Sequence, residues 1–189
     1  MSLRIVNLYD LVDAMGEAAA EKILSAFSCP KNSEVERFLH TQALDFARRK
    51  LAVTYLLINE EGKISAFFTL THKAVQIENA ALSVRLRKKI ARYAVPDRGS
   101  GGFVLSAFLI AQFGRDFTEH DITGAELMTS CLNILRRIQR VIGGGVVYLE
   151  CENEEKLLQF YKRDDIGFRC FGERQSEEGV CYHQLLKAF

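Results

Sequence analysis

The chain has 189 residues, of which 48% are hydrophobic and 26% are charged, and its formal net charge at pH 7 is +1. This composition is typical of one folded domain and excludes a disordered chain, a collagen-like chain and a small disulfide-rich scaffold. A chain of this length buries roughly 70% of the surface that its unfolded form exposes, so its core needs no metal or disulfide support. The near-neutral charge provides no global field that would attract nucleic acid or an anionic membrane.

The five cysteines are widely spread without a C-x-x-C pair, and the four histidines show no spacing of four residues. We therefore expect neither a disulfide framework nor a bound metal. No stretch of the sequence approaches the ~20 consecutive apolar residues of a spanning helix. The N-terminus lacks the basic and apolar regions of a secretory signal. These features predict a cytoplasmic protein with no membrane partner.

The first quarter of the sequence predicts a short strand and two helices. Residues 3–8 have a mixed strand pattern, and Asp10 is the expected N-cap of a helix that runs to about residue 27. Ser33 and Glu36 have the spacing of a capping box and predict a second helix.

A hairpin and an inserted helix follow. Segments 51–58 and 63–71 are rich in β-formers, and Gly62 between them can take the positive φ of a hairpin loop. Segment 74–102 combines apolar residues at helical spacing with basic residues, and it ends in a glycine-rich turn. We interpret it as a helical insertion between two strands.

The second half predicts an alternation of strands and helices. Residues 103–113 form an unbroken apolar run, typical of a strand buried on both faces. Thr123 and Glu126 then form a capping box at the start of a long helix that ends at the glycines 143–145. The remaining expected elements are a strand at 146–151, a helix from about 153 to 161, and strands at 168–171 and 180–186. The fold class is therefore mixed α/β.

Two pairs of residues in the last third carry a resemblance to a known family. The helix that follows strand 146–151 ends in Phe160-Tyr161, and the chain returns to the sheet through Gly167-Phe168. This arrangement resembles the closing half of the GNAT superfamily, the acetyl-coenzyme A dependent N-acetyltransferases. The block 103–142 resembles the strand, pyrophosphate loop and helix of that family, and the likeness covers roughly residues 1–73 and 103–189.

The resemblance implies a fold and a co-substrate. It implies one GNAT-like domain over residues 1–189, with a mostly antiparallel central sheet flanked by helices and the insertion at about 74–102. The central strands 103–113 and 146–151 would be splayed, and acetyl-CoA would bind beside them without any metal. The residues implied for its binding are Gln112, Phe113, Gly114, Arg115, Thr123, Gly124, Ala125, Asn153 and Tyr161.

The expected phosphate loop, which begins at His120, departs from the usual family pattern and keeps only Gly124 clearly. A helix start attracts anions through its free N–H groups and its dipole. Asp121 and Glu126 place negative charge beside the proposed phosphates, which weakens the site unless both carboxylates point away.

Three side chains are candidates for catalysis. By resemblance, Tyr161 lies near the thioester sulfur, and a tyrosine with an ordinary pKa near ~10 can donate a proton to the departing thiolate. Glu150 and Glu152 share one face of a strand, and either is a candidate general base. The alternatives are that Tyr161 is a packing residue and that both glutamates are solvated or paired charges. A covalent route through Cys151 is not favoured, because the sequence places no histidine beside it.

The leading prediction is an N-acetyltransferase that moves acetyl from acetyl-CoA to a primary amine by direct attack in a ternary complex. One alternative is a catalytically inactive GNAT-like module that binds acyl-CoA or regulates a partner. Another is a toxin-type enzyme that acetylates aminoacyl-tRNA, suggested only by the basic run Arg85–Arg92. The net charge does not favour nucleic acid as a partner. Homodimer formation through the C-terminal strands stays open.

Overall fold

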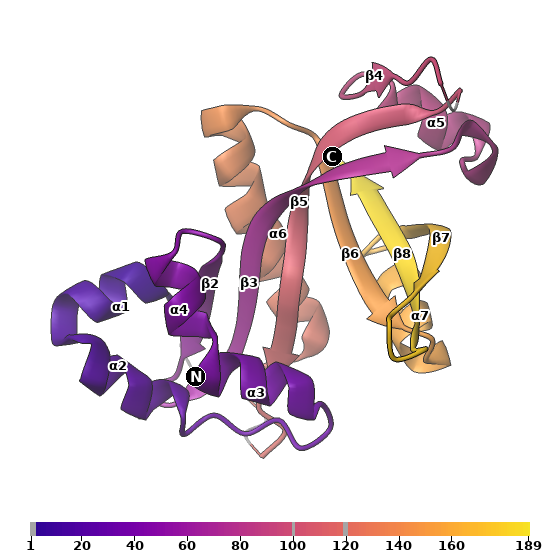
Figure 1. Cartoon of the computed structure of the whole chain (residues 1–189). Helices are drawn as coiled ribbons and strands as arrows, with labels where there is room; N and C mark the ends of the chain where they lie inside the picture. Colours follow the sequence, from indigo (N-terminus) through magenta and orange to yellow (C-terminus); the bar gives the residue numbers. More distant parts are fainter. Residues whose placement is uncertain (1–2, 100, 119–120) are drawn as a thin grey trace. The chain divides into compact units, whose positions relative to one another are not determined.

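The computed structural model describes residues 3–99, 101–118 and 121–189 (Figure 1). His120, the first residue of the expected phosphate loop, lies outside the described residues. The elements up to residue 96 are β1 (Arg4–Asn7), α1 (Leu8–Met15), α2 (Glu17–Leu24), α3 (Ser33–Thr41), α4 (Ala43–Arg48), β2 (Val53–Ile58), β3 (Ile64–Ile77), the 3-10 helix η1 (Asn79–Ala81), α5 (Val84–Ile90) and β4 (Val95–Pro96). The elements that follow are β5 (Phe103–Arg115), α6 (Gly124–Ile142), β6 (Val146–Glu152), α7 (Glu155–Lys162), β7 (Arg169–Gln175) and β8 (Cys181–Ala188).

The strands form a mixed, mostly antiparallel sheet with the order β1-β2-β3-β5-β6-β8-β7, and β4 pairs with β5. The pairs β1–β2, β2–β3, β4–β5, β6–β8 and β7–β8 are antiparallel, whereas β5 and β6 are parallel. The parallel ladder joins Phe108 to Val147 and Leu109 to Tyr148. Only these two register pairs link β5 to β6 in the described chain, as expected for splayed central strands.

The chain divides into two compact units. The first comprises the residues up to Thr71 together with Ile110–Cys131. Its core lies where the amphipathic helices α1 to α4 meet the apolar residues of β2 and β3. The rings of Phe27 and Phe67 meet edge to face with centroids 5.2 Å apart, and Leu39 and Leu56 are fully buried.

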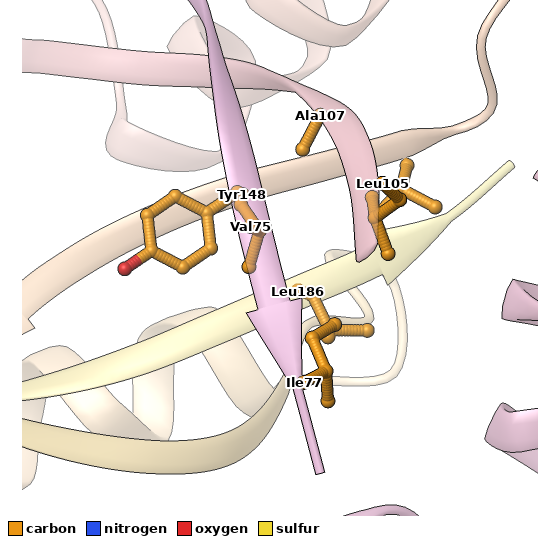
Figure 2. Close-up of a pocket in the computed structure, with 7 residues that line it drawn as sticks. Val75, Ile77, Leu105, Ala107, Tyr148 and Leu186 are labelled. Atoms are coloured by element: carbon orange, nitrogen blue, oxygen red, sulfur yellow. The ribbon is translucent and has the colours of Figure 1, made fainter. Parts of the chain in front are cut away.

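The second unit comprises His72–Leu109 and Leu132–Phe189. Its core joins residues of β3, β5, β6 and β8 to α5, whose Ile90 is fully buried. Figure 2 shows six of these side chains, namely Val75, Ile77, Leu105, Ala107, Tyr148 and Leu186. The gap that they line, together with Val146, is too narrow to hold a water molecule. It is therefore core packing and not a ligand site.

Two helix starts differ from the sequence prediction. Asn7, and not Asp10, is the N-cap of α1, because its side chain accepts a hydrogen bond from Tyr9 N at 2.9 Å. Asn32, and not Ser33, is the N-cap of α3, and its side chain accepts from Val35 N at 3.0 Å. In both cases an asparagine on the N-terminal side of the expected residue accepts the capping hydrogen bond.

Several element boundaries also differ. The helix expected up to residue 27 is divided at Gly16, whose φ of 82° no helix interior tolerates. β3 continues past Thr71 to Ile77, and α5 covers only seven residues of the segment expected to be an inserted helix. The expectation of one domain with an insertion at about 74–102 stays a prediction.

Candidate functional site

The start of α6 is organised by the capping box that the sequence predicts. Thr123 N and Thr123 Oγ1 donate to Glu126 Oε2 at 2.8 and 2.7 Å. Glu126 N lies 3.3 Å from Thr123 Oγ1, which completes the reciprocal pair. The first helical hydrogen bond of α6 runs from Leu127 N to Thr123 O at 3.0 Å. The N–H groups of Gly124 and Ala125 precede that bond, so they are the backbone donors that this helix start offers to an anion.

Both carboxylates near this loop are held by donors of the protein. Asp121 Oδ2 accepts from Asn59 Nδ2 at 3.0 Å and from Ser65 Oγ at 2.8 Å, and these hydrogen bonds lower the pKa of Asp121. The hydrogen bonds from Thr123 likewise lower the pKa of Glu126. The carboxylates of Asp121 and Glu126 are therefore both held near the start of α6 by hydrogen bonds from other residues of the protein.

The end of β5 leads into the same loop. Arg115 Nη1 donates to Ile122 O at 3.4 Å, and its guanidinium lies 4.4 Å from the centroid of the Phe117 ring. Gly114 is buried, and a Cβ built on it would lie 2.4 Å from Val35 Cγ1. Gln112 and Phe113 are half-buried on the same strand. The first unit thus contains all the residues expected to hold the pantetheine and the pyrophosphate except Asn153 and Tyr161.

Tyr161 lies in the second unit, in the last turn of α7. Its side chain is buried, and its ring meets the rings of Phe160 and Phe168 with centroids 5.1 and 6.0 Å away. Phe168 N donates to Tyr161 O at 3.0 Å, which ties the helix end to the return of the chain. Gly167, with a φ of 78°, forms the turn between them. The ring is therefore held firmly, as both a catalytic and a packing role would require.

Glu150 is the centre of a polar cluster in the second unit. Its Oε2 accepts from Arg174 Nε at 2.8 Å, and Lys73 Nζ lies 3.4 Å from its Oε1. The hydroxyl of Tyr148 donates to Oε1 of the same carboxylate. Gln184 Nε2 in turn donates to the Tyr148 hydroxyl at 2.9 Å. The Tyr148 ring belongs to the apolar core of Figure 2, so the cluster joins that core to the surface.

The partners of Glu150 fix its charge. Burial of the carboxylate opposes its ionisation, but the hydrogen bonds from Arg174 and Tyr148 and the charge of Lys73 outweigh burial and lower the pKa of Glu150 to about 2. Burial and the Glu150 carboxylate raise the pKa of the Tyr148 hydroxyl, which stays protonated. A carboxylate with such a low pKa is a weak proton acceptor at neutral pH. The geometry therefore favours the paired-charge alternative for Glu150.

Glu152 and Asn153 follow Glu150 at the end of β6. Glu152 is exposed and lies opposite Tyr182 in the ladder with β8. Asn153 Oδ1 lies 2.9 Å from His183 Nε2, and Asn153 N donates to Cys181 O at 3.2 Å. Asn153 is thus already engaged by protein groups, and its expected role at the coenzyme stays a prediction.

The sequence does not predict the residues that contact Glu150 or the histidine that lies opposite Cys151. Arg174 and Lys73 come from β7 and β3, and no local motif marks either residue. His183 lies directly opposite Cys151 in the β6–β8 ladder, although no histidine is near Cys151 in the sequence. Only the strand register brings these side chains together.

The first unit has a surface hollow of about 190 Å³, which is smaller than the ~300–1,000 Å³ of typical ligand pockets. Its lining residues are Tyr9, Val12, Asp13, Glu17, Leu44, Ala47, Arg48 and Lys50. Within residues 3–99, 101–118 and 121–189, no group of three or more His, Cys, Asp or Glu side chains could hold a metal ion. Over those same ranges, none of the helices has the length and apolar character needed to cross a bilayer.

Of the comparisons with known proteins, only the comparison with solved structures finds similar proteins. No protein-family model matches the sequence, and no curated protein matches it. Among solved structures, AtaT in complex with acetyl-methionyl-tRNAfMet is similar with a TM-score of 0.67 and 20% identity, over 96% of this chain and 94% of that one. A tyrosine-to-phenylalanine variant of KacT is similar with a TM-score of 0.66 and 15% identity, over 97% and 95%. AtaTR bound with acetyl-CoA gives a TM-score of 0.60 and 18% identity, over 96% and 92%.

These likenesses extend over nearly the whole of this chain and of each compared chain. The chain therefore has the GNAT fold.

Proposed function

We propose that the chain is an N-acetyltransferase that moves the acetyl group of acetyl-CoA directly onto a primary amine within a ternary complex. The observation that carries the proposal is the likeness, along almost the full length, to AtaTR bound with acetyl-CoA. The free N–H groups at the start of α6 and the fixed ring of Tyr161 at the end of α7 support it.

The chemistry assigns few side-chain roles. The attacking amine must be neutral, and the tetrahedral oxyanion needs an N–H donor. In this proposal Gly124 and Ala125 bind the pyrophosphate through their backbone N–H groups, and Tyr161 protonates the departing thiolate. Glu150 holds its charge partners, which leaves Glu152 or water to accept the proton of the amine.

A second candidate function is acetylation of an aminoacyl-tRNA. The specific observation in its favour is the likeness to AtaT complexed with acetyl-methionyl-tRNAfMet, and KacTA has been solved with DNA. Helix α5 places four cationic residues in seven, namely Arg85, Arg87, Lys88 and Lys89. Nucleic acid is therefore a candidate partner despite the net charge of +1. We also propose that the protein acts in the cytoplasm, where acetyl-CoA and charged tRNA are both present.

Isothermal titration with acetyl-CoA tests the main proposal, and a heat of binding at micromolar to millimolar ligand is expected. Release of free coenzyme A thiol with a panel of amines then separates an enzyme from a module that only binds the coenzyme. Absence of binding at millimolar acetyl-CoA would remove the proposal.

For the second candidate, the decisive measurement is acetylation of aminoacyl-tRNA as a function of salt. Neutralising Arg85, Arg87, Lys88 and Lys89 together should weaken tRNA binding and flatten its salt dependence. Equal binding by this variant would show that α5 is only a solvated helix face.

A further inference from the structure

Cys170, His183 and Asn153 form a connected set of side chains in the second unit. Cys170 Sγ lies 3.8 Å from His183 Nδ1, and His183 Nε2 lies 2.9 Å from Asn153 Oδ1. The three residues come from β7, from β8 and from the end of β6, which are neighbours in the sheet (Figure 1). A thiol, an imidazole and an amide oxygen in this order are the parts of an activated cysteine nucleophile.

The strand register explains how Cys170 reaches the imidazole. His183 lies directly opposite Glu173 in the β7–β8 ladder, whereas Cys170 pairs with Leu185. The register shifts between Cys170 and Gly172, which marks a β-bulge at this point. Such bulges commonly redirect a side chain, and this one is consistent with the short distance between Cys170 and His183.

The hydrogen bonds set the proton positions. With Asn153 Oδ1 as the acceptor, His183 Nε2 carries a proton. Nδ1 of the neutral ring then faces two groups, namely the Cys170 thiol at 3.8 Å, which can donate to it, and the Glu173 carboxylate at 3.2 Å, which cannot. Cys170 Sγ also lies 3.5 Å from Gly172 O, a second acceptor for the same thiol. Glu173 Oε1 lies 3.2 Å from Nδ1 and can stabilise the imidazolium once the ring takes up a proton.

The other four cysteines differ from Cys170, although Cys151 also lies opposite His183 in the β6–β8 ladder. Burial raises the pKa of Cys29 and of Cys131, and it raises the pKa of Cys151 to about 11. Cys181 is half-buried, and its Sγ donates to Glu173 Oε2 at 4.0 Å. Cys170 is half-buried beside the imidazole. It is therefore the thiol best placed to react.

We propose that Cys170 is a nucleophile that accepts acyl groups from thioesters, with His183 as its proton acceptor and Asn153 as the positioning residue of His183. The Cys170 sulfur forms a bond to the acetyl carbonyl carbon, and the bond from that carbon to the donor sulfur breaks. The thiol proton passes to His183 Nδ1 and then to the departing thiolate. The product is S-acetyl-Cys170 and a free thiol. This goes beyond the proposed function, because direct attack by an amine uses no thiol of the protein.

The first experiment measures the reactivity of each cysteine in the folded protein. Limited iodoacetamide at neutral pH followed by peptide mapping should alkylate Cys170 at least about tenfold faster than Cys181, its matched half-buried control. His183→Gln should slow alkylation of Cys170 by about tenfold or more. Asn153→Ala should slow alkylation of Cys170 less than His183→Gln does. Asn153→Asp keeps an acceptor for His183 Nε2, so Cys170 of this variant should be alkylated at the wild-type rate. Thermal unfolding of each variant shows whether the fold is retained.

The second experiment uses two acyl donors. Acetyl-CoA and a small acetyl thioester of cysteamine are each incubated with the protein, and the acetyl group is located by peptide mapping. Acetylation of Cys170 by the small thioester, lost in His183→Gln, supports the proposal even if acetyl-CoA does not bind and the proposed function fails. Binding of acetyl-CoA with amine acetylation, but with no S-acetyl-Cys170 from either donor, overturns this inference and leaves the proposed function intact. Equal reactivity of Cys170 and Cys181 in the native protein also overturns it, whatever the variants do.

Discussion

Arg174 Nη2 lies 2.6 Å from Glu150 Oε2, and the same guanidinium covers the ring of Tyr182 with its carbon 5.0 Å from the ring centroid. The Glu150 side chain is only 15% exposed, whereas that of Arg174 is 44% exposed. The carboxylate is thus the inner member of the pair, and the arginine covers it from the solvent side. This arrangement makes Glu150 a structural anion of the second unit.

We predict that Glu150 makes stability depend on pH in the acid range. Its pKa is about 2 in the folded chain against an ordinary value of 4.5, so the unfolded chain takes up the proton first as the pH falls. The contribution is therefore complete above about pH 5 and is lost between there and about pH 2, and it amounts to at most about 3 kcal/mol. Urea unfolding of wild type and of Glu150→Gln across this range should show a difference that disappears at low pH. Glu152→Gln, on an exposed side chain, is the control and should keep the wild-type slope.

Tyr161→Phe should lower the turnover of acetyl transfer by about 10²–10⁴ while the dissociation constant of acetyl-CoA changes little. The hydroxyl would be lost, but the ring contacts with Phe160 and Phe168 would be kept. Steady-state kinetics and titration calorimetry measure the two quantities. Tyr55→Phe, in β2, is the matched control and should leave both unchanged. Full turnover in Tyr161→Phe would mean that the residue is only packing.

Glu126→Ala should have opposite effects on stability and on coenzyme affinity. The change removes one half of the capping box of α6 and lowers the melting temperature, because Thr123 N and Thr123 Oγ1 lose their acceptor. It also removes a negative charge and frees an N–H group at the helix start, so acetyl-CoA should bind roughly two- to fivefold more tightly. Glu34→Ala, in the first turn of α3, is the control for the loss of an acidic residue from a helix start. Weaker binding by Glu126→Ala would place the phosphates elsewhere.

Gly114→Ala should destabilise the first unit by about 1–3 kcal/mol, because the new methyl group would meet Val35 Cγ1 at 2.4 Å and Phe67 Cε1 at 3.4 Å. Urea unfolding measures this cost. Gly99→Ala is the control, since its Cβ would meet only Asp97 Oδ1 at 3.5 Å, and it should change stability by less than about 0.5 kcal/mol. An unchanged stability of Gly114→Ala would show that Val35 can move aside.

The order of strands and helices was readable because long periodic segments carry strong signals. The strand β5, the apolar stripe of α6 and the hairpin loop at Gly62 all lie where the sequence predicts them. The prediction that β5 is buried on both faces is wrong, because Val104, Ser106 and Ala111 are exposed.

The ends of the helices and strands are harder to predict, because a single residue can decide where an element stops. Gly16 interrupts a continuous helical pattern. The end of β3, with Val75 and Ile77 buried, lies within the segment that the sequence predicts as helix.

The candidate site was readable only in part, for a different reason. Tyr161, Thr123 and Glu126 lie in local motifs, so their positions on α7 and α6 follow from the neighbouring sequence. The ion pair of Glu150 with Arg174 and the contact of Cys170 with His183 depend on ladders between strands that are separate in the chain. A bulge at Cys170 and Gly172 adds a shift of register that no periodicity reveals.

The position of β8 has a consequence for synthesis of the protein. β8 pairs with β6 on one side and with β7 on the other, yet it follows both in the chain. While the ribosome is still translating β8, the apolar residues Val146, Val147 and Leu149 of β6 have no strand on that side. The nascent second unit is therefore open to unwanted strand pairing until β8 emerges, and a chaperone that shields this edge should raise the yield of folded protein.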